Sequence, residues 1–249
     1  MLPFRRYAVR AQGHAFHVME SGPPDGPAVL LLHGNPTWGF LWRKVAAALD
    51  GSGLRLVMPD LLGLGLSDKP RDPAVHKLER HASICGEWLD GLLPARFAIA
   101  AQDWGGPIAL AAAAARAERV TALVLGNTVA TPPREGFRPA FFHRFARWPA
   151  VPWIAFRLLG FPQRSLPLAQ GDRGSIRGDV ARAYRWPLRG LSRNVAPLAL
   201  ARMVPDSAAH PSIEPLRRCQ SFVQGFAGPV ELVWGVRDPV LGRVIGHLE

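Results

Sequence analysis

Five short apolar runs, separated by stretches of helical length, constrain the fold of this chain more than any other feature of its sequence. The runs are residues 27–33, 54–59, 97–101, 120–125 and 230–234. Continuous apolar runs of this length are typical of strands buried on both faces, as in a parallel sheet. Helices are expected at residues 40–49, 77–92, 106–117 and 213–226. The alternation predicts an α/β fold with a mostly parallel sheet and helices on both faces.

Residues 130–215 break this pattern, with frequent proline, tryptophan and arginine and short amphipathic pieces at 137–148 and 182–186. We interpret this segment as an inserted helical cap. The predicted organisation is a core at residues 1–129, a cap at 130–215 and a return to the core at 216–249. Residues 1–20 alternate apolar and polar side chains, which predicts a two-stranded hairpin and lacks the apolar stretch of a signal peptide.

Composition and charge limit the kinds of partner expected for this chain. Its formal charge is +11, yet the basic residues are scattered apart from a loose concentration between Arg134 and Arg193, so no nucleic-acid partner is expected. Cys85 and Cys219 match neither a metal spacing nor a disulfide framework, which favours a cytoplasmic protein. The most apolar stretch, residues 107–115, is too short to span a bilayer, so neither a membrane segment nor a membrane partner is expected. No metal or cofactor is predicted, and the oligomeric state stays open.

The segment 97–108 carries the candidate nucleophile. An apolar strand is followed by Ala101-Gln102-Asp103-Trp104-Gly105 and then by a helix. Small residues flank a nucleophile in such a sharp strand-to-helix turn because the two elements approach closely there. Asp103 stands in the nucleophile position, where a helix N-terminus favours its ionised form. An aspartate before a helix also serves as a cap, but a cap alone does not explain the glycines at 105 and 106.

A loop at residues 33–38 follows the first buried run and is expected at the carboxyl edge of the sheet, where ligands bind in α/β folds. The backbone N–H groups of Asn35 and Trp104 are the expected donors of an oxyanion hole. The glycine-rich loop at residues 60–70 lacks the spacing of a dinucleotide-binding loop, and no helix begins directly after it. We therefore do not interpret it as a phosphate site.

Four motifs follow one another through most of the chain: His33-Gly34-Asn35-Pro36, the 60–70 loop, Gln102-Asp103-Trp104-Gly105-Gly106 and Trp234-Gly235-Val236-Arg237-Asp238-Pro239. Together they resemble the haloalkane dehalogenases, which are α/β-hydrolases related to the epoxide hydrolases. The resemblance implies the α/β-hydrolase fold and cleavage of carbon–halogen bonds in small apolar haloalkanes through an ester on Asp103. It also implies that the Asn35 amide and the Trp104 indole, both N–H donors, hold the departing halide.

Two other functions stay open. An epoxide hydrolase or another α/β-hydrolase would use the same Asp103. Resemblance to the epoxide hydrolases would imply a pair of cap tyrosines that donate hydrogen bonds to the epoxide oxygen. The predicted cap carries one tyrosine, Tyr184. The second alternative is an inactive, truncated hydrolase that binds ligands or partners.

Ester hydrolysis requires a water activated by a histidine that an acid orients. Asp238 matches the acid position of the family, although Asp before Pro is also common in plain turns. The resemblance places the histidine after a further helix and strand, and His247 follows Asp238 too closely for both. We therefore expect a chain that stops before the catalytic histidine and lacks the last strand and helix. His33 is expected to be structural, and surface or capping roles are expected for His76, His81, His143 and His210.

Overall fold

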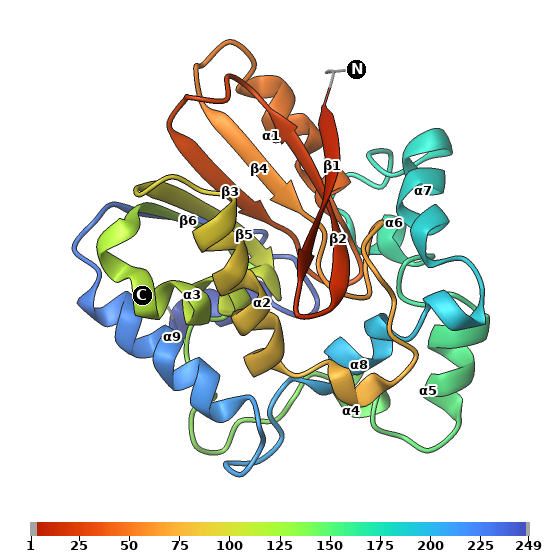
Figure 1. Cartoon of the computed structure of the whole chain (residues 1–249). Helices are drawn as coiled ribbons and strands as arrows, with labels where there is room; N and C mark the ends of the chain where they lie inside the picture. Colours follow the sequence, from red (N-terminus) through yellow and green to blue (C-terminus); the bar gives the residue numbers. More distant parts are fainter. Residues whose placement is uncertain (1–3, 248–249) are drawn as a thin grey trace.

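The computed structural model describes residues 4–247, which form one seven-stranded sheet in the order β1-β2-β4-β3-β5-β6-β7 (Figure 1). The strands are β1 (Arg5–Ala11), β2 (His14–Ser21), β3 (Ala28–Leu32), β4 (Arg55–Pro59), β5 (Phe97–Asp103), β6 (Val120–Thr128) and β7 (Val230–Val233). Strand β2 pairs antiparallel with β1 and with β4, and all other neighbours are parallel. The mostly parallel sheet and the N-terminal hairpin are confirmed.

Helices cover both faces of this sheet. The covering elements are α1 (Arg43–Ala48), α2 (Leu78–Gly91), α3 (Gly105–Ala113) and α9 (Ile213–Gly225), with the 3-10 turns η1 (Gly39–Trp42), η2 (Pro73–Val75), η3 (Ala114–Arg119) and η7 (Gly242–His247). The helices expected at 40–49 and 106–117 each divide into an α-helical and a 3-10 part. In the second case Arg116 leaves helical geometry, with φ of −143°, so the pattern predicted the position of the helix but not its kink.

The two faces can be followed along β3, because successive side chains of a strand point to opposite faces. Leu30 and Leu32 are fully buried in the apolar cluster that includes α2, α3 and α9. Leu31 packs in a second cluster with Ala46 of α1. Helices α2, α3 and α9 lie together in Figure 1.

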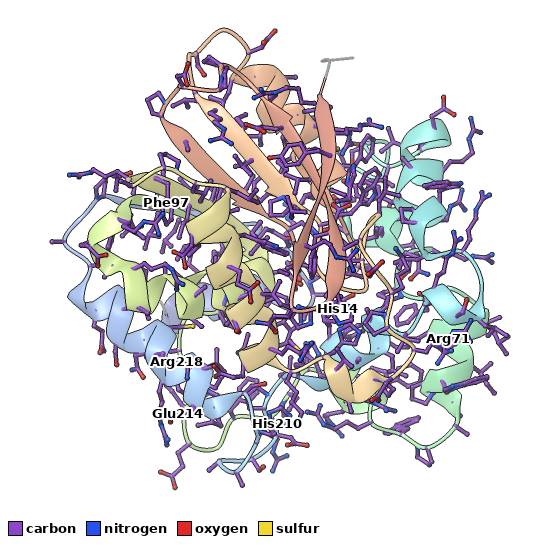
Figure 2. The ribbon with its side chains drawn as sticks, viewed as in Figure 1. His14, Arg71, Phe97, His210, Glu214 and Arg218 are labelled. Atoms are coloured by element: carbon purple, nitrogen blue, oxygen red, sulfur yellow. The ribbon has the colours of Figure 1, made fainter. Side chains whose placement is uncertain are left out.

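An ion pair on the molecular surface links two of these helices, α9 and α2. Arg218 of α9 pairs with Glu79 of α2 across 2.5 Å, and Glu214 lies on the same helix one turn before (Figure 2). None of the helices in residues 4–247 combines the length and apolarity needed to cross a bilayer.

The segment 130–215 is built from short elements. These are α4 (Phe141–Phe145), α5 (Val151–Trp153), the π-helical turn η4 (Ile154–Leu158), α6 (Leu166–Ala169), α7 (Gly178–Arg185), η5 (Trp186–Leu188), η6 (Leu191–Arg193) and α8 (Ala196–Arg202). Phe156 and Leu198 form a small apolar cluster of their own. The segment is joined to the sheet by Trp38, whose indole N–H donates to the Ala183 carbonyl at 3.1 Å.

Candidate active site

The turn between β5 and α3 brings strand and helix very close together. A Cβ atom on Gly105 would overlap the Leu32 carbonyl oxygen, and one on Gly106 would overlap the Thr128 hydroxyl. Asp103, two residues before Gly105, has φ of 54°, in the left-handed region that side chains rarely adopt. The close approach explains why glycines follow Trp104, and it matches the sharp turn expected from the sequence.

Backbone groups hold the Asp103 carboxylate. The N–H of Asn35 donates to Asp103 Oδ1 at 2.7 Å, and the N–H of Trp104 also donates to this carboxylate. A Cβ atom on Gly34 would collide with the carboxylate, so the 33–38 loop reaches it because residue 34 is glycine. The Thr128 hydroxyl donates to the Asp103 carbonyl oxygen at 2.6 Å. Both backbone donors expected for the oxyanion hole therefore converge on one side chain.

Burial has the largest effect on the protonation of Asp103. It raises the pKa of this carboxyl to about 6, against the two backbone N–H donors, which lower it. The nearby Asp238 raises the pKa further by like-charge repulsion. The Trp104 N–H at the helix N-terminus favours the ionised form, as expected, but burial outweighs it. The pKa still lies below neutral, so the carboxylate form prevails at pH 7.

A cavity of about 860 Å³ is lined by Asp103, Trp104 and Asp238 together. Its remaining lining is mostly apolar, with Pro107, Val129, Phe137, Leu216, Val236 and Val244 among the residues that form it. Arg134 and Arg138 also line it. A half-buried carboxylate at the wall of an apolar cavity is suited to reaction with an apolar electrophile, because the cavity limits the water that competes for the nucleophile.

Asp238 is fixed in the turn after β7. Its Oδ1 accepts from the backbone N–H groups of Val240, at 2.7 Å, and Leu241, at 3.0 Å. Its Oδ2 accepts from Asn127 Nδ2 at 3.2 Å. Asn127, the residue before the end of β6, has φ of 36°, and its Oδ1 accepts from the Gly235 N–H at 2.6 Å. Sequence reasoning missed Asn127, and the available signal was a polar residue two positions after the apolar run 120–125.

The two residues expected to hold a halide are placed differently. Trp104 is buried and lines the cavity, and no hydrogen bond within residues 4–247 uses its indole N–H. The Asn35 side chain is outside the cavity lining, and its Nδ2 donates to the Pro197 carbonyl of α8 at 2.9 Å. The structure thus brings Asp103, Trp104 and Asp238 to one cavity, and Asn35 contributes its backbone there.

The histidines differ in part from expectation. His33 is structural as expected: its Nε2 accepts from the Leu61 N–H, so its Nδ1 carries the proton donated to the Gly34 carbonyl. Surface positions for His76, His81 and His143 are wrong, since all three are buried, and His76 occupies the C-cap position of η2. A single histidine shows no apolar periodicity, so its burial depends on distant contacts that the sequence pattern does not reveal.

His210 was expected in a surface or capping role, and His247 was not favoured as the base. His210 accepts the Ser212 N–H at 3.1 Å, which is a capping contact. The side chain of His247 lies outside the described part of the structure. Of the histidine side chains that the structure describes, His143 lines the cavity.

Tyr184 bears on the epoxide-hydrolase alternative. Its hydroxyl accepts from Arg43 Nη1 at 2.9 Å, and its ring packs against Phe40 at 5.4 Å. The residue belongs to the apolar cluster on the α1 face and is outside the cavity lining. It is therefore not positioned to donate to a substrate beside Asp103.

The fold and the strand-to-helix turn define an α/β-hydrolase, and a family model described as "alpha/beta hydrolase fold" matches residues 27–242. A haloalkane dehalogenase of Mycolicibacterium paratuberculosis is 31% identical over 230 residues, covering 91% of this chain and 73% of that protein. Haloalkane dehalogenase 2 of Mycobacterium bovis is 35% identical over 240 residues, covering 96% and 80%. The crystal structure of haloalkane dehalogenase DatA from Agrobacterium tumefaciens matches with a TM-score of 0.81 at 26% identity, covering 92% and 78%.

These similarities show that the chain belongs to the haloalkane dehalogenase family of α/β-hydrolases. The fold, the hydrolase class and the family predicted from the ordered motifs are confirmed. The roles of individual residues rest on the geometry described above.

Proposed function

We propose that this chain cleaves the carbon–halogen bond of small apolar haloalkanes, with Asp103 as the nucleophile. The observation that carries the proposal is a half-buried carboxylate, held by two backbone N–H groups in a strained turn, at the wall of a largely apolar cavity. Membership of the family, whose relatives are haloalkane dehalogenases, supports the same chemistry.

In the first step, a carboxylate oxygen of Asp103 attacks the carbon that bears the halogen. A C–O bond forms, the carbon–halogen bond breaks, and the halide leaves with the bonding electron pair. Because Oδ1 accepts the Asn35 N–H, we assign the attack to Oδ2. This step needs no base, since a pKa of about 6 leaves the carboxyl ionised at neutral pH.

The departing halide needs hydrogen-bond donors away from water. We assign the Trp104 indole N–H to this role because it lines the cavity and carries no hydrogen bond in the described structure. Asn35 is the second candidate, because its amide retains one N–H after donating to Pro197.

In the second step, water gives a proton to a base and attacks the carbonyl carbon of the ester, and the backbone N–H groups of Asn35 and Trp104 stabilise the oxyanion. The bond between the carbonyl carbon and the alkyl oxygen then breaks, the alcohol leaves with that proton, and the Asp103 carboxyl is regenerated. Family resemblance assigns a histidine to activation of this water and Asp238 to its orientation. Asn127 would position Asp238 through the 3.2 Å hydrogen bond.

The domain roles follow from the cavity. We propose that residues 130–215 act as a cap over a core of residues 1–129 and 216–249, because Phe137, Ala140 and Pro205 line the same cavity as Asp103. The two cysteines are free and buried, which supports the cytoplasmic location expected from the sequence. Small apolar molecules are the proposed substrates, and no nucleic-acid partner is proposed.

Bromide release from 1-bromohexane tests the proposal. We expect release by the unmodified chain and none above background by Asp103→Asn. Asp25→Asn, which changes an exposed carboxyl, is the matched control and should behave as the unmodified chain. Diol formation from 1,2-epoxyhexane without bromide release would instead support the epoxide-hydrolase alternative. A folded chain that reacts with neither compound would support the inactive alternative.

A further inference from the structure

The positive charge of the chain is concentrated in one third of its length. Residues 130–215 hold 13 arginines, no lysine and five acidic residues, a net charge of +8 out of +11. Within the described structure, the arginines of this segment form two ion pairs, Arg147 with Asp206 and Arg182 with Asp179, and Glu214 pairs with Arg217 just beyond the segment. Figure 2 shows nitrogen atoms at the tips of many side chains along the part of the chain that contains α5, α6 and α7. Most of this charge is therefore available to an anionic partner.

The same segment carries a helix that is apolar on its outer side. Along α5 and η4, Val151, Ile154 and Leu158 are exposed by 52%, 44% and 52%, at the i, i+3, i+7 spacing of one helix face. The opposite side is apolar as well, because Phe156 is fully buried. Apart from Arg157, this helix is apolar on both its inner and its outer side, which is typical of a helix that contacts protein on one side and protein or lipid on the other. Figure 1 shows α5 at the edge of the molecule opposite α3 and α9.

Aromatic and basic side chains border this helix face. Trp148 and Trp153 are each about half exposed, at 50% and 46%, and Phe141 packs edge-on against Trp148 at 6.1 Å. The Arg157 guanidinium lies 5.5 Å from the centre of the Trp153 ring. Tryptophan and arginine together are characteristic of the boundary between lipid headgroups and acyl chains, where the ring is half buried and the cation meets phosphate.

We propose that this surface, formed by Phe141, Trp148, Val151, Trp153, Ile154 and Leu158 and here named the α5 face, binds an anionic membrane surface. The apolar side chains enter the headgroup region, and Arg144, Arg157 and Arg164 contact the lipid phosphates. The binding is peripheral. The proposal changes one expectation from the sequence, that of no membrane partner, because exposure of these side chains depends on tertiary packing. It does not depend on the activity of Asp103.

Charge and polarity favour a membrane over other occupants. A second copy of the chain would bring two segments of +8 together, and like charges oppose such a contact. A nucleic acid is bound by basic and polar side chains, whereas the centre of the α5 face is apolar. An anionic bilayer matches both the arginine rim and the apolar centre.

Vesicle co-sedimentation tests the proposal. The chain is mixed with vesicles of phosphatidylcholine alone and with vesicles of equal parts phosphatidylcholine and phosphatidylglycerol, at low and at physiological salt. We expect binding to the mixed vesicles that weakens with salt, and little binding to phosphatidylcholine. The double variant Ile154→Glu/Leu158→Glu should bind at least about tenfold more weakly, because two carboxylates replace side chains that enter the bilayer.

Matched variants separate the α5 face from general effects. Val45→Glu changes an exposed apolar residue of α1, and it should leave vesicle binding unchanged. Arg144→Gln/Arg164→Gln, both at exposed positions, should weaken binding about tenfold by loss of charge alone. Arg96→Gln, an exposed arginine before β5, should not. If the double glutamate variant fails to fold by circular dichroism, the arginine pair provides the decisive comparison.

Three outcomes would overturn the proposal. The first is no binding to the mixed vesicles at low salt. The second is binding that the α5-face variants and their controls share equally. The third is a dimer, or a complex with a DNA duplex, that the α5-face variants disrupt while vesicle binding is absent.

Discussion

The sheet with its covering helices and the segment 130–215 use apolar residues in opposite ways. In the sheet, Leu30, Leu32 and Met58 are fully buried, and the elements run for up to 14 residues, as in α2. In the segment, elements are three to eight residues long, and large apolar side chains such as Leu159 remain more than half exposed. The sheet therefore fixes the position of the Asp103 carboxylate, and the segment contributes part of the cavity wall and an exposed apolar surface.

Replacing a glycine should have the largest effect and should differ most between the two regions. Gly105→Ala would place a methyl group on the rigid Leu32 carbonyl, so we expect a loss of about 3 kcal/mol in the free energy of unfolding. Gly171→Ala, in the 130–215 segment, meets open space and should change stability by less than about 1 kcal/mol. Urea denaturation measures both, and equal losses would contradict the comparison.

The indole of Trp104 should matter for rate and that of Trp88 should not. Trp104→Phe keeps a ring in the cavity wall but removes the N–H assigned to the halide, so bromide release should fall about 100-fold. Trp88 of α2 is buried on the same side of the sheet, and its Nε1 finds no partner in the described structure. Trp88→Phe should therefore leave the rate nearly unchanged. A similar loss in both variants would reduce the role of Trp104 to packing.

Loss of an ion pair should destabilise the sheet more than it destabilises the segment 130–215. Glu20 of β2 is buried and forms ion pairs with Arg5 and Arg55. Glu20→Gln removes the negative charge that both arginines contact, so the free energy of unfolding should fall by about 2 kcal/mol. Asp179 and Arg182 of α7 form an exposed pair, and Asp179→Asn should cost less than about 0.5 kcal/mol. Thermal unfolding at low and high salt measures both costs, and a salt-sensitive loss at Glu20 would speak against its burial.

The sequence predicts the sheet region better than the segment 130–215, and the reason is physical. The strands and the turn at Asp103 are local features, since apolar runs and the small residues around a nucleophile are contiguous in the chain. The contacts that complete the site are not local. The Asn35 side chain donates a hydrogen bond to the Pro197 carbonyl, and the Asn127 side chain accepts one from the Gly235 N–H. Neither pair is close in sequence.

The segment 130–215 was recognised by composition, but its elements were not placed well. The amphipathic piece at 137–148 contains the five-residue helix α4, and α5 and η4 were not predicted. Helices this short cover too few turns to show a 3.6-residue period. An apolar residue at 154 or 158 also looks the same in a sequence whether it is buried or exposed, so the α5 face required the structure.

The pH dependence of the first step should give a smaller, graded effect. The pKa of Asp103, raised to about 6 by burial, means that the reactive carboxylate is lost as the pH falls through 6. The initial rate of bromide release should fall about tenfold for each pH unit below that value. The raised pKa also means that the folded state takes up this proton before the unfolded chain does, so Asp103 itself makes folding more favourable as the pH falls. A rate that stays constant down to pH 4 would contradict the assigned pKa.

Formation of an ester on Asp103 is the central claim, and mass spectrometry of the chain after brief exposure to 1-bromohexane at pH 7 tests it most directly. We predict that a hexyl group is found on the peptide that contains Asp103, and that Asp103→Asn, folded by circular dichroism, remains unmodified. A chain that releases bromide while the hexyl group resides on another residue, or while both forms are alkylated alike, would contradict the account.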